Sequence, residues 1–238
     1  MIILIIILIN ILTNNTSKIY KLFNPICLYE DIYIENKKLL NYNYKLSPIS
    51  VTNIQALQII GILESFRPNN ICEFRTGVTT DIFDFYCEKY NKNILTIEHN
   101  IKYKRKHSKI FKLIIKGNVT INNIEYKDTN FYNGLENFFK SYHKKFDFIL
   151  IDAPAGENNK YKYARIQMID FIIYDLLDNE GYFLIHNVEK KCIENSVNIL
   201  LSLFKTKNYN IKIEYLGYKK QKTLAIIEFK KKLIKLNK

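Results

Sequence analysis

The chain has 238 residues, of which 47% are hydrophobic, and it carries a formal net charge of +13. This length supports one sizeable core, and only 7 Gly and 4 Pro residues argue against long flexible linkers. Lysines spread along the chain supply most of the charge, because the only arginines are Arg67, Arg75, Arg105 and Arg165. Nucleic-acid readers favour arginine, so the composition argues against nucleic acid as a partner. The four cysteines show no Cys-x-x-Cys spacing, which argues against a zinc knuckle or a redox pair.

Residues 1–46 are predicted to form an N-terminal extension, and residues 47–238 a single α/β domain. The extension starts with an almost wholly apolar stretch, Met1–Leu12, which is shorter than the ~20 residues that span a bilayer. It lacks the basic start and the small-residue cleavage site of a secretory signal. A buried element, a weak membrane anchor and an atypical signal all stay open. We expect a cytoplasmic protein, with membrane association through residues 1–12 as the alternative.

Strand-like and helix-like segments alternate along the rest of the chain. In chain order they are a helix over 54–66, a strand over 71–74, a helix over 81–90, a strand over 94–97, a charged helix over 101–111, two β-like runs within 112–124, a helix over 135–142, a strand over 146–151, a helix over 163–177, a strand over 182–185, a helix over 189–205 and a hairpin of 211–216 with 223–229. One run within 112–124 should join the main sheet. The order predicts a doubly wound, mostly parallel sheet with an antiparallel hairpin at its C-terminal end.

Polar residues end four of these strands, namely Glu73, Glu98, Asp152 and His186. In a doubly wound sheet, ligands bind beyond the carboxyl ends of the strands. Gly77 follows the first strand in a tight turn that opens a helix, where backbone N–H groups can meet a ligand. The sequence therefore predicts a ligand site at this edge of the sheet.

The residue types suggest a role for each of these groups. Glu98 lies roughly 20 residues after the turn, where a carboxylate accepts two hydrogen bonds from a ribose diol and thus selects a nucleoside. Glu73 either orients the loop or binds an ammonium group. Asp152 and His186 end adjacent central strands, so they suit proton removal from a hydroxyl. Together with Asn187 they could instead ligate a divalent cation.

Four motifs in register resemble those of the class I S-adenosylmethionine-dependent methyltransferases, over about Ser47 to Phe229. They are Glu73–Thr80, Thr96–His99, Phe146–Pro154 and Leu177–Glu189. The resemblance implies a Rossmann-like methyltransferase fold with a seven-stranded sheet and S-adenosylmethionine as the cofactor. It also implies catalysis by Asp152 and His186, and cofactor binding by Glu73, Phe74, Arg75, Gly77, Thr80, Glu98 and His99.

Two positions depart from the family pattern. Arg75 replaces a motif glycine, and its side chain either fills the pocket, turns outward or pairs with the cofactor's carboxylate. His186-Asn187 stands where metal-dependent O-methyltransferases carry Asp-Asn, so no metal is predicted. The Asp-Ala-Pro segment after Ile151 also resembles a polysaccharide O-methyltransferase branch.

The leading hypothesis is methyl transfer to a hydroxyl of a small molecule or a sugar. One alternative is a cofactor-free pseudo-methyltransferase that serves as a binding or structural protein. The other is a nucleic-acid methyltransferase, which the net charge suggests but which lacks the Asn/Asp-Pro-Pro-Tyr type of motif.

Overall fold

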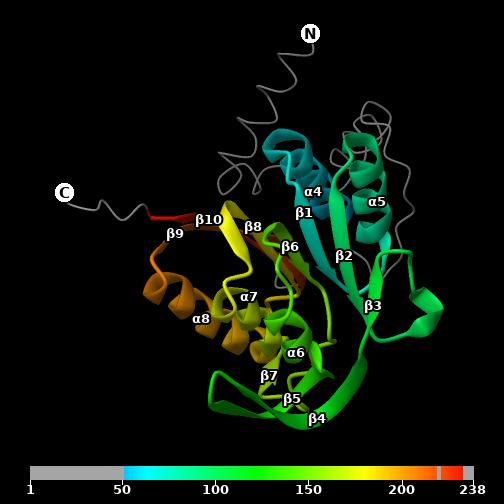
Figure 1. The fold of residues 1–238 in the computed structure, drawn as a ribbon. Coiled ribbons are helices and arrows are strands. Elements are labelled where there is room, and N and C mark those ends of the chain that lie inside the picture. Colours follow the sequence, from blue (N-terminus) through cyan, green and yellow to red (C-terminus); the bar gives the residue numbers. More distant parts are fainter. Residues whose placement is uncertain (1–50, 219–220, 233–238) are drawn as a thin grey trace. The chain divides into compact units, whose positions relative to one another are not determined.

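The computed structural model describes residues 51–218 and 221–232, and the ribbon in Figure 1 follows them in sequence colours. The prediction of an extension over residues 1–46, and the alternatives for Met1–Leu12, lie outside the described residues. Within the described part, no helix is both long enough and apolar enough to cross a bilayer.

Seven strands form the main sheet, in the order β3-β2-β1-β6-β8-β10-β9. Strands β3, β2, β1, β6 and β8 run parallel, whereas β10 pairs antiparallel with both β8 and β9. This arrangement confirms the predicted fold class, including the antiparallel C-terminal hairpin. The strands are β1 (Asn70–Phe74), β2 (Asn93–Glu98), β3 (Ser108–Ile110), β6 (Phe146–Ile151), β8 (Leu177–His186), β9 (Tyr209–Tyr218) and β10 (Gln221–Lys231).

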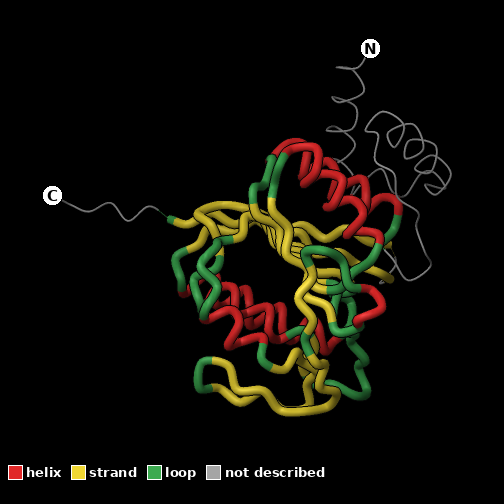
Figure 2. The backbone as a smooth tube through the Cα atoms, turned by 45° about the vertical axis from the view of Figure 1, so that its right-hand side comes forward, coloured by secondary structure: helices red, strands yellow, loops and turns green. Residues whose placement is uncertain are grey.

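Helices cover both faces of this sheet, as Figures 1 and 2 show. Helices α4 (Asn53–Phe66) and α5 (Val78–Tyr90) lie on one face, and α6 (Leu135–Lys140), α7 (Asp170–Ile173) and α8 (Lys191–Thr206) lie on the other. Helix α4 begins with a capping box between Thr52 and Gln55, which satisfies two backbone donors. Successive side chains of each strand therefore point into two apolar layers, one on each face of the sheet.

Strands β6 and β8 approach each other closely where Gly181 stands. A Cβ atom at Gly181 would lie 2.1 Å from the backbone oxygen of Asp147, so only glycine fits there. The Asp147 carboxylate in turn accepts hydrogen bonds from the backbone N–H groups of Asn69, at 2.7 Å, and Asn70, at 2.9 Å. These contacts fix the register of β1, β6 and β8 at the end of the sheet opposite the predicted site.

A second, three-stranded sheet in the order β4-β5-β7 contains β4 (Lys112–Ile121), β5 (Ile124–Asn133) and β7 (Tyr163–Ala164). The β4–β5 turn is Asn122-Asn123, and both residues adopt the left-handed conformation typical of a two-residue hairpin. The expectation that a run within 112–124 joins the main sheet was therefore wrong. That position belongs to the short edge strand β3, because Ser108–Ile110 pairs with β2.

Two predicted helices were also wrong. Residues 101–111 contain only the 3₁₀ turn η1 (Ile101–Tyr103), a loop and β3. Residues 163–177 contain β7, the 3₁₀ turn η2 (Ile166–Ile169) and the four-residue α7, because Arg165 and Asp175 have positive φ angles of 65° and 51° that interrupt a helix.

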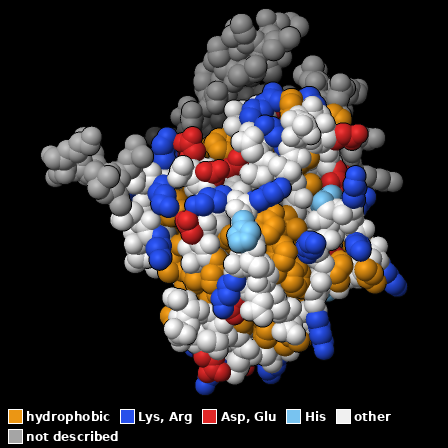
Figure 3. All heavy atoms as spheres, in the orientation of Figure 1, with side chains coloured by type: hydrophobic (Ala, Val, Ile, Leu, Met, Phe, Trp, Pro, Cys, Tyr) orange, Lys and Arg blue, Asp and Glu red, His pale blue; other side chains and the backbone are white. Residues whose placement is uncertain are grey.

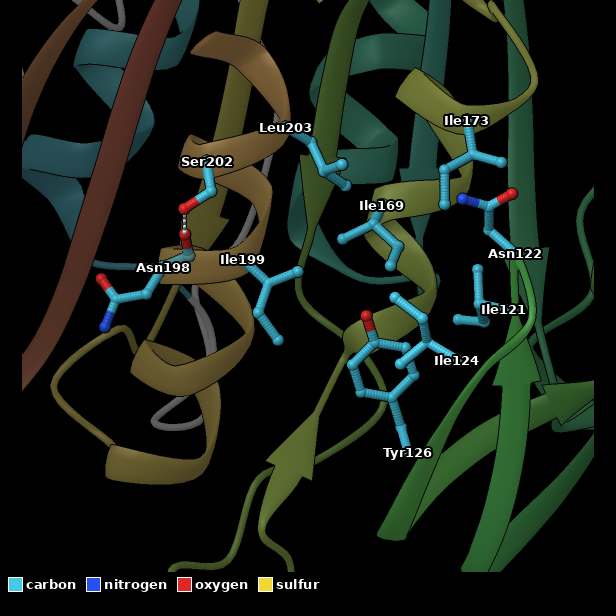
Figure 4. Close-up of a pocket in the computed structure, with 10 residues that line it drawn as sticks. All are labelled: Ile121, Asn122, Ile124, Tyr126, Ile169, Ile173, Asn198, Ile199, Ser202 and Leu203. Atoms are coloured by element: carbon cyan, nitrogen blue, oxygen red, sulfur yellow. Dashed lines mark hydrogen bonds between the residues drawn. The ribbon is translucent and has the colours of Figure 1, made fainter. Parts of the chain in front are cut away.

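The second sheet encloses an apolar hollow of about 310 Å³ against α8. Figure 4 shows side chains pointing into this space from Ile121, Ile124 and Tyr126 of the hairpin and from Ile199 and Leu203 of α8. Only Tyr126 among these five side chains titrates, so this hollow offers packing rather than acid–base chemistry.

Candidate active site

The turn between β1 and α5 leaves room for a ligand at Gly77, whereas Arg75 adopts a backbone conformation that is unusual for a residue with a side chain. Gly77 is the N-cap of α5, and a Cβ added there would meet nothing within 4 Å, so open space borders it. Arg75 has a φ of 87°, a conformation that favours glycine. Its backbone N–H donates to the Ile97 oxygen at 2.8 Å, which ties the turn to β2.

Glu73 is fully buried, and its carboxyl group faces the first turn of α5. Its oxygens accept hydrogen bonds from the hydroxyls of Thr79 and, at 2.7 Å, Thr80. Burial raises the pKa of Glu73 to about 8, although both hydroxyls oppose the rise. Of the two roles predicted for Glu73, this geometry favours the orientation of the turn.

The side chains of Phe74 and Thr80 stabilise the turn through contacts within the protein. The Phe74 ring is buried against the rings of Tyr132, Phe139 and Phe171 on the opposite face. The Thr80 hydroxyl accepts from the Gly77 N–H at 2.7 Å. Both side chains are thus committed to the protein, and a ligand would meet the backbone of this segment.

Glu98 ends β2 with its side chain almost wholly buried beside the same turn. One carboxylate oxygen accepts from the Thr76 N–H at 2.8 Å. The other accepts from the N–H groups of His99, at 2.7 Å, and Asn100, at 2.9 Å, and lies 3.0 Å from the His99 Nδ1. The carboxylate therefore holds the turn in place, and it retains part of its acceptor capacity.

Asp152 directly follows β6 and His186 ends the neighbouring strand β8, and the structure brings the two side chains together. The His186 Nδ1 lies 2.9 Å from an Asp152 carboxylate oxygen. The Asp152 side chain is 17% exposed, whereas that of His186 is 1% exposed. Burial opposes ionisation of Asp152, but the His186 hydrogen bond and the charges of Arg165 and Arg75 outweigh it and lower the pKa of Asp152.

Arg165 is the residue of this site that sequence reasoning missed. Its buried guanidinium donates to four backbone oxygens, those of Ile151, Asp152, Pro154 and His186, and it lies 3.4 Å from the Asp152 carboxylate. One cation thus joins the ends of β6 and β8. The one available signal was its rarity, since an arginine in a lysine-rich chain marks a need for a planar, multidentate donor.

Part of this site borders a polar hollow of about 330 Å³. Its lining comprises Val51, residues 75–79, Asp81, Tyr103, Arg105 and Asp152. The Arg75 guanidinium has no hydrogen-bonded or ion-paired partner in the described part of the chain. Its charge nevertheless acts on Asp152 and Tyr132, so the side chain lies near the ends of β6 and β5.

Buried polar atoms without partners lie in the same region. Among the described residues, the Tyr132 hydroxyl, the His186 Nε2 and the Thr76 hydroxyl are buried and accept or donate no hydrogen bond. The charges of Glu98, Arg165 and Arg75 act on Tyr132, which places its hydroxyl among the site residues. Unpaired buried polar atoms are costly, so a polar ligand with hydroxyl and charged groups fits this edge of the sheet.

Metal-ligating side chains do not gather here. Within residues 51–218 and 221–232, no three His, Cys, Asp or Glu side chains come close enough together to hold a metal ion.

No model of a protein family matches the chain, and no curated protein matches its sequence. Solved structures do resemble it. The SAH-bound methyltransferase PaMTH1 of Podospora anserina is 13% identical, with a TM-score of 0.50 over 85% of this chain and 88% of that chain. The O-methyltransferase TomG of Streptomyces achromogenes, in complex with SAM, is 9% identical, with a TM-score of 0.51 over 85% and 96%. Cofactor-bound Rv0187 from MTB is 10% identical, with a TM-score of 0.51 over 86% and 90%. The chain therefore has the Rossmann-like fold of the class I S-adenosylmethionine-dependent methyltransferases.

Proposed function

We propose that this protein is an S-adenosylmethionine-dependent methyltransferase that methylates a hydroxyl oxygen of a small molecule or a sugar unit. The Asp152–His186 pair carries the proposal, because a carboxylate in contact with an imidazole borders the polar hollow at the ends of two central strands. The methyltransferase fold and the solved relatives with SAH or SAM support the cofactor assignment.

The turn and the end of β2 would hold the cofactor. The backbone of residues 75–79, which follows Phe74, borders the hollow, and Glu73 and Thr80 keep this backbone in place. The remaining acceptor capacity of Glu98 serves a ribose hydroxyl, with His99 beside it. The unpaired Arg75 guanidinium serves the carboxylate of the cofactor's amino-acid part.

When bound, the cofactor supplies an electrophilic methyl group on a sulfonium. The chain's own task is to position the acceptor oxygen and remove its proton. Asp152 faces the polar hollow and is ionised at neutral pH, so its carboxylate accepts the hydroxyl proton. His186 lies behind it and donates its Nδ1–H to the same carboxyl group, while Arg165 fixes the backbone of both residues.

Calorimetry with S-adenosylhomocysteine tests the proposal. We expect micromolar binding to the wild type and a loss of about tenfold or more in Glu98→Ala and Glu98→Gln, since a charge-assisted hydrogen bond disappears. Circular dichroism checks that each variant folds. Folded wild-type protein that fails to bind millimolar ligand would instead favour the pseudo-methyltransferase alternative.

A further inference from the structure

The segment that joins β2 to β3 forms one rim of the polar hollow. All side chains from Ile101 to Lys106 are exposed, including two large apolar ones, Ile101 at 65% and Tyr103 at 60%. Tyr103 and Arg105 line the hollow itself. An exposed aromatic ring at the mouth of a candidate site is a surface on which a ligand ring can stack.

One ion pair and one imidazole–carboxylate contact anchor this segment to α5. The Arg105 guanidinium lies 2.8 Å from the Asp81 carboxylate, and the His107 Nδ1 lies 3.3 Å from the Asp84 carboxylate. Asp81 and Asp84 are one turn apart on α5, so both anchors come from one helix face. The anchors set the position of Tyr103, and Arg105 also compensates the charge of Asp81.

The remaining charge on the rim is positive. Lys102, Lys104 and Lys106 are exposed, and none has an ion pair within the part of the chain that the structure describes. Figure 3 shows blue and orange side chains next to each other at the right-hand edge of the molecule, where the segment between β2 and β3 lies in Figure 1. Cationic and apolar groups therefore alternate beside the hollow.

Inside the hollow, the negative charges are already compensated. Asp81 is paired with Arg105, and Asp152 contacts both His186 and Arg165. A neutral acceptor would leave three rim lysines without a counter-charge, whereas an anionic acceptor would be attracted by them and steered into the hollow.

We propose that the rim formed by Lys102, Tyr103, Lys104 and Lys106 selects an acceptor that carries a carboxylate or a phosphate in addition to its reactive hydroxyl. The ring or sugar face of the acceptor stacks on Tyr103, and its anion contacts the lysines. This inference rests on the proposed function, because it takes the bound molecule to be the methyl acceptor. The charge selectivity of the rim can be measured by binding alone.

Three probes that share a ring and a hydroxyl but differ in charge test the proposal: 4-hydroxybenzoate, 4-hydroxyphenyl phosphate and the neutral 4-hydroxybenzyl alcohol. Each is titrated into ¹⁵N-labelled protein, with and without S-adenosylhomocysteine, and amide shifts of residues 101–106 report binding. We expect at least one anion to bind about tenfold more tightly than the alcohol, with a preference that falls as salt is added. The carboxylate and phosphate probes identify which anion the rim prefers.

Matched variants separate a local effect from the net charge of the protein. Lys102→Gln/Lys104→Gln/Lys106→Gln should abolish the preference for the anions. Lys144→Gln/Lys205→Gln/Lys207→Gln removes the same charge from exposed lysines outside the segment 101–106, and it should leave the preference intact. Tyr103→Ala should weaken binding of all three probes.

Three outcomes would each overturn the proposal. They are equal binding of the neutral and anionic probes, equal losses in the two triple variants, and no binding of any probe at ~10 mM, which corresponds to a negligible affinity. Failure of the proposed function looks different, because S-adenosylhomocysteine then does not bind while the rim still distinguishes the anions from the alcohol.

Discussion

Substitution of Glu73 by glutamine should make the stability of the protein less sensitive to pH. Glu73 is fully buried, and burial raises its pKa from 4.5 to about 8. Near neutral pH the carboxyl group is therefore mostly protonated. In this form one of its oxygens donates to a threonine hydroxyl, whereas in the ionised form both oxygens accept from Thr79 and Thr80. Glutamine presents an NH2 donor group and an acceptor oxygen in nearly the same shape, but it does not titrate.

The sign and size of the effect follow from the two pKa values. Because the folded protein binds the proton more tightly than the unfolded chain, the stability from this group is complete below pH 4.5 and is lost as the pH rises through 8. A tenfold change in proton affinity is worth about 1.4 kcal/mol, so the rise from 4.5 to about 8 corresponds to at most about 5 kcal/mol. At pH 5 the variant and the wild type should be almost equally stable, and above pH 8 the variant should be the more stable.

Urea unfolding of both proteins between pH 5 and 9 measures this difference, and subtraction removes the contributions of all other titrating groups. Glu125→Gln, on the exposed hairpin, is the control and should show no pH-dependent difference. Parallel stability curves for the wild type and Glu73→Gln, or a variant that loses stability at high pH, would show that the carboxyl group is not buried in its protonated form.

Three further predictions concern the turn, the base and the sheet. Arg75→Gly should raise the free energy of unfolding by about 1 kcal/mol, since it relieves a positive φ angle, while it weakens binding of S-adenosylhomocysteine by calorimetry. Asp152→Asn should leave that binding unchanged and lower the methyl-transfer rate by about 100-fold or more, and an equal loss of both would assign Asp152 to the cofactor instead. Gly181→Ala should destabilise the protein by about 3 kcal/mol or more in urea unfolding, because its Cβ would overlap the Asp147 oxygen, and a change below 1 kcal/mol would mean that β6 and β8 can separate there.

The main sheet could be predicted because its strands are short apolar runs that end in polar residues. Glu98 and His186 each close a strand of the main sheet, as expected, Asp152 directly follows β6, and Glu73 stands one residue before the end of β1. Arg75 stands in a turn where the family pattern has glycine, and its φ of 87° is the backbone conformation that favours glycine. Local pattern was sufficient here, since each of these features depends on neighbours in the sequence.

Features that depend on distant residues could not be predicted in the same way. The charged stretch from Ile101 resembles a surface helix, but Arg105 and His107 pair with α5, and only Ser108–Ile110 adds to β2. The hairpin turn Asn122-Asn123, by contrast, is a local signal, because two consecutive asparagines favour the left-handed conformation of such a turn. The role of Arg165 required knowledge of where four carbonyl groups meet in space.

Arg165 directly follows β7, and β7 pairs with β5 of the second sheet. The small sheet is therefore connected to the Asp152–His186 pair through the Arg165 guanidinium, and the Asn130 side chain of β5 also donates to the Ala155 oxygen shortly after Asp152. Shortening the hairpin of β4 and β5 should therefore disturb the Asp152–His186 pair, even though none of the hairpin residues borders the polar hollow.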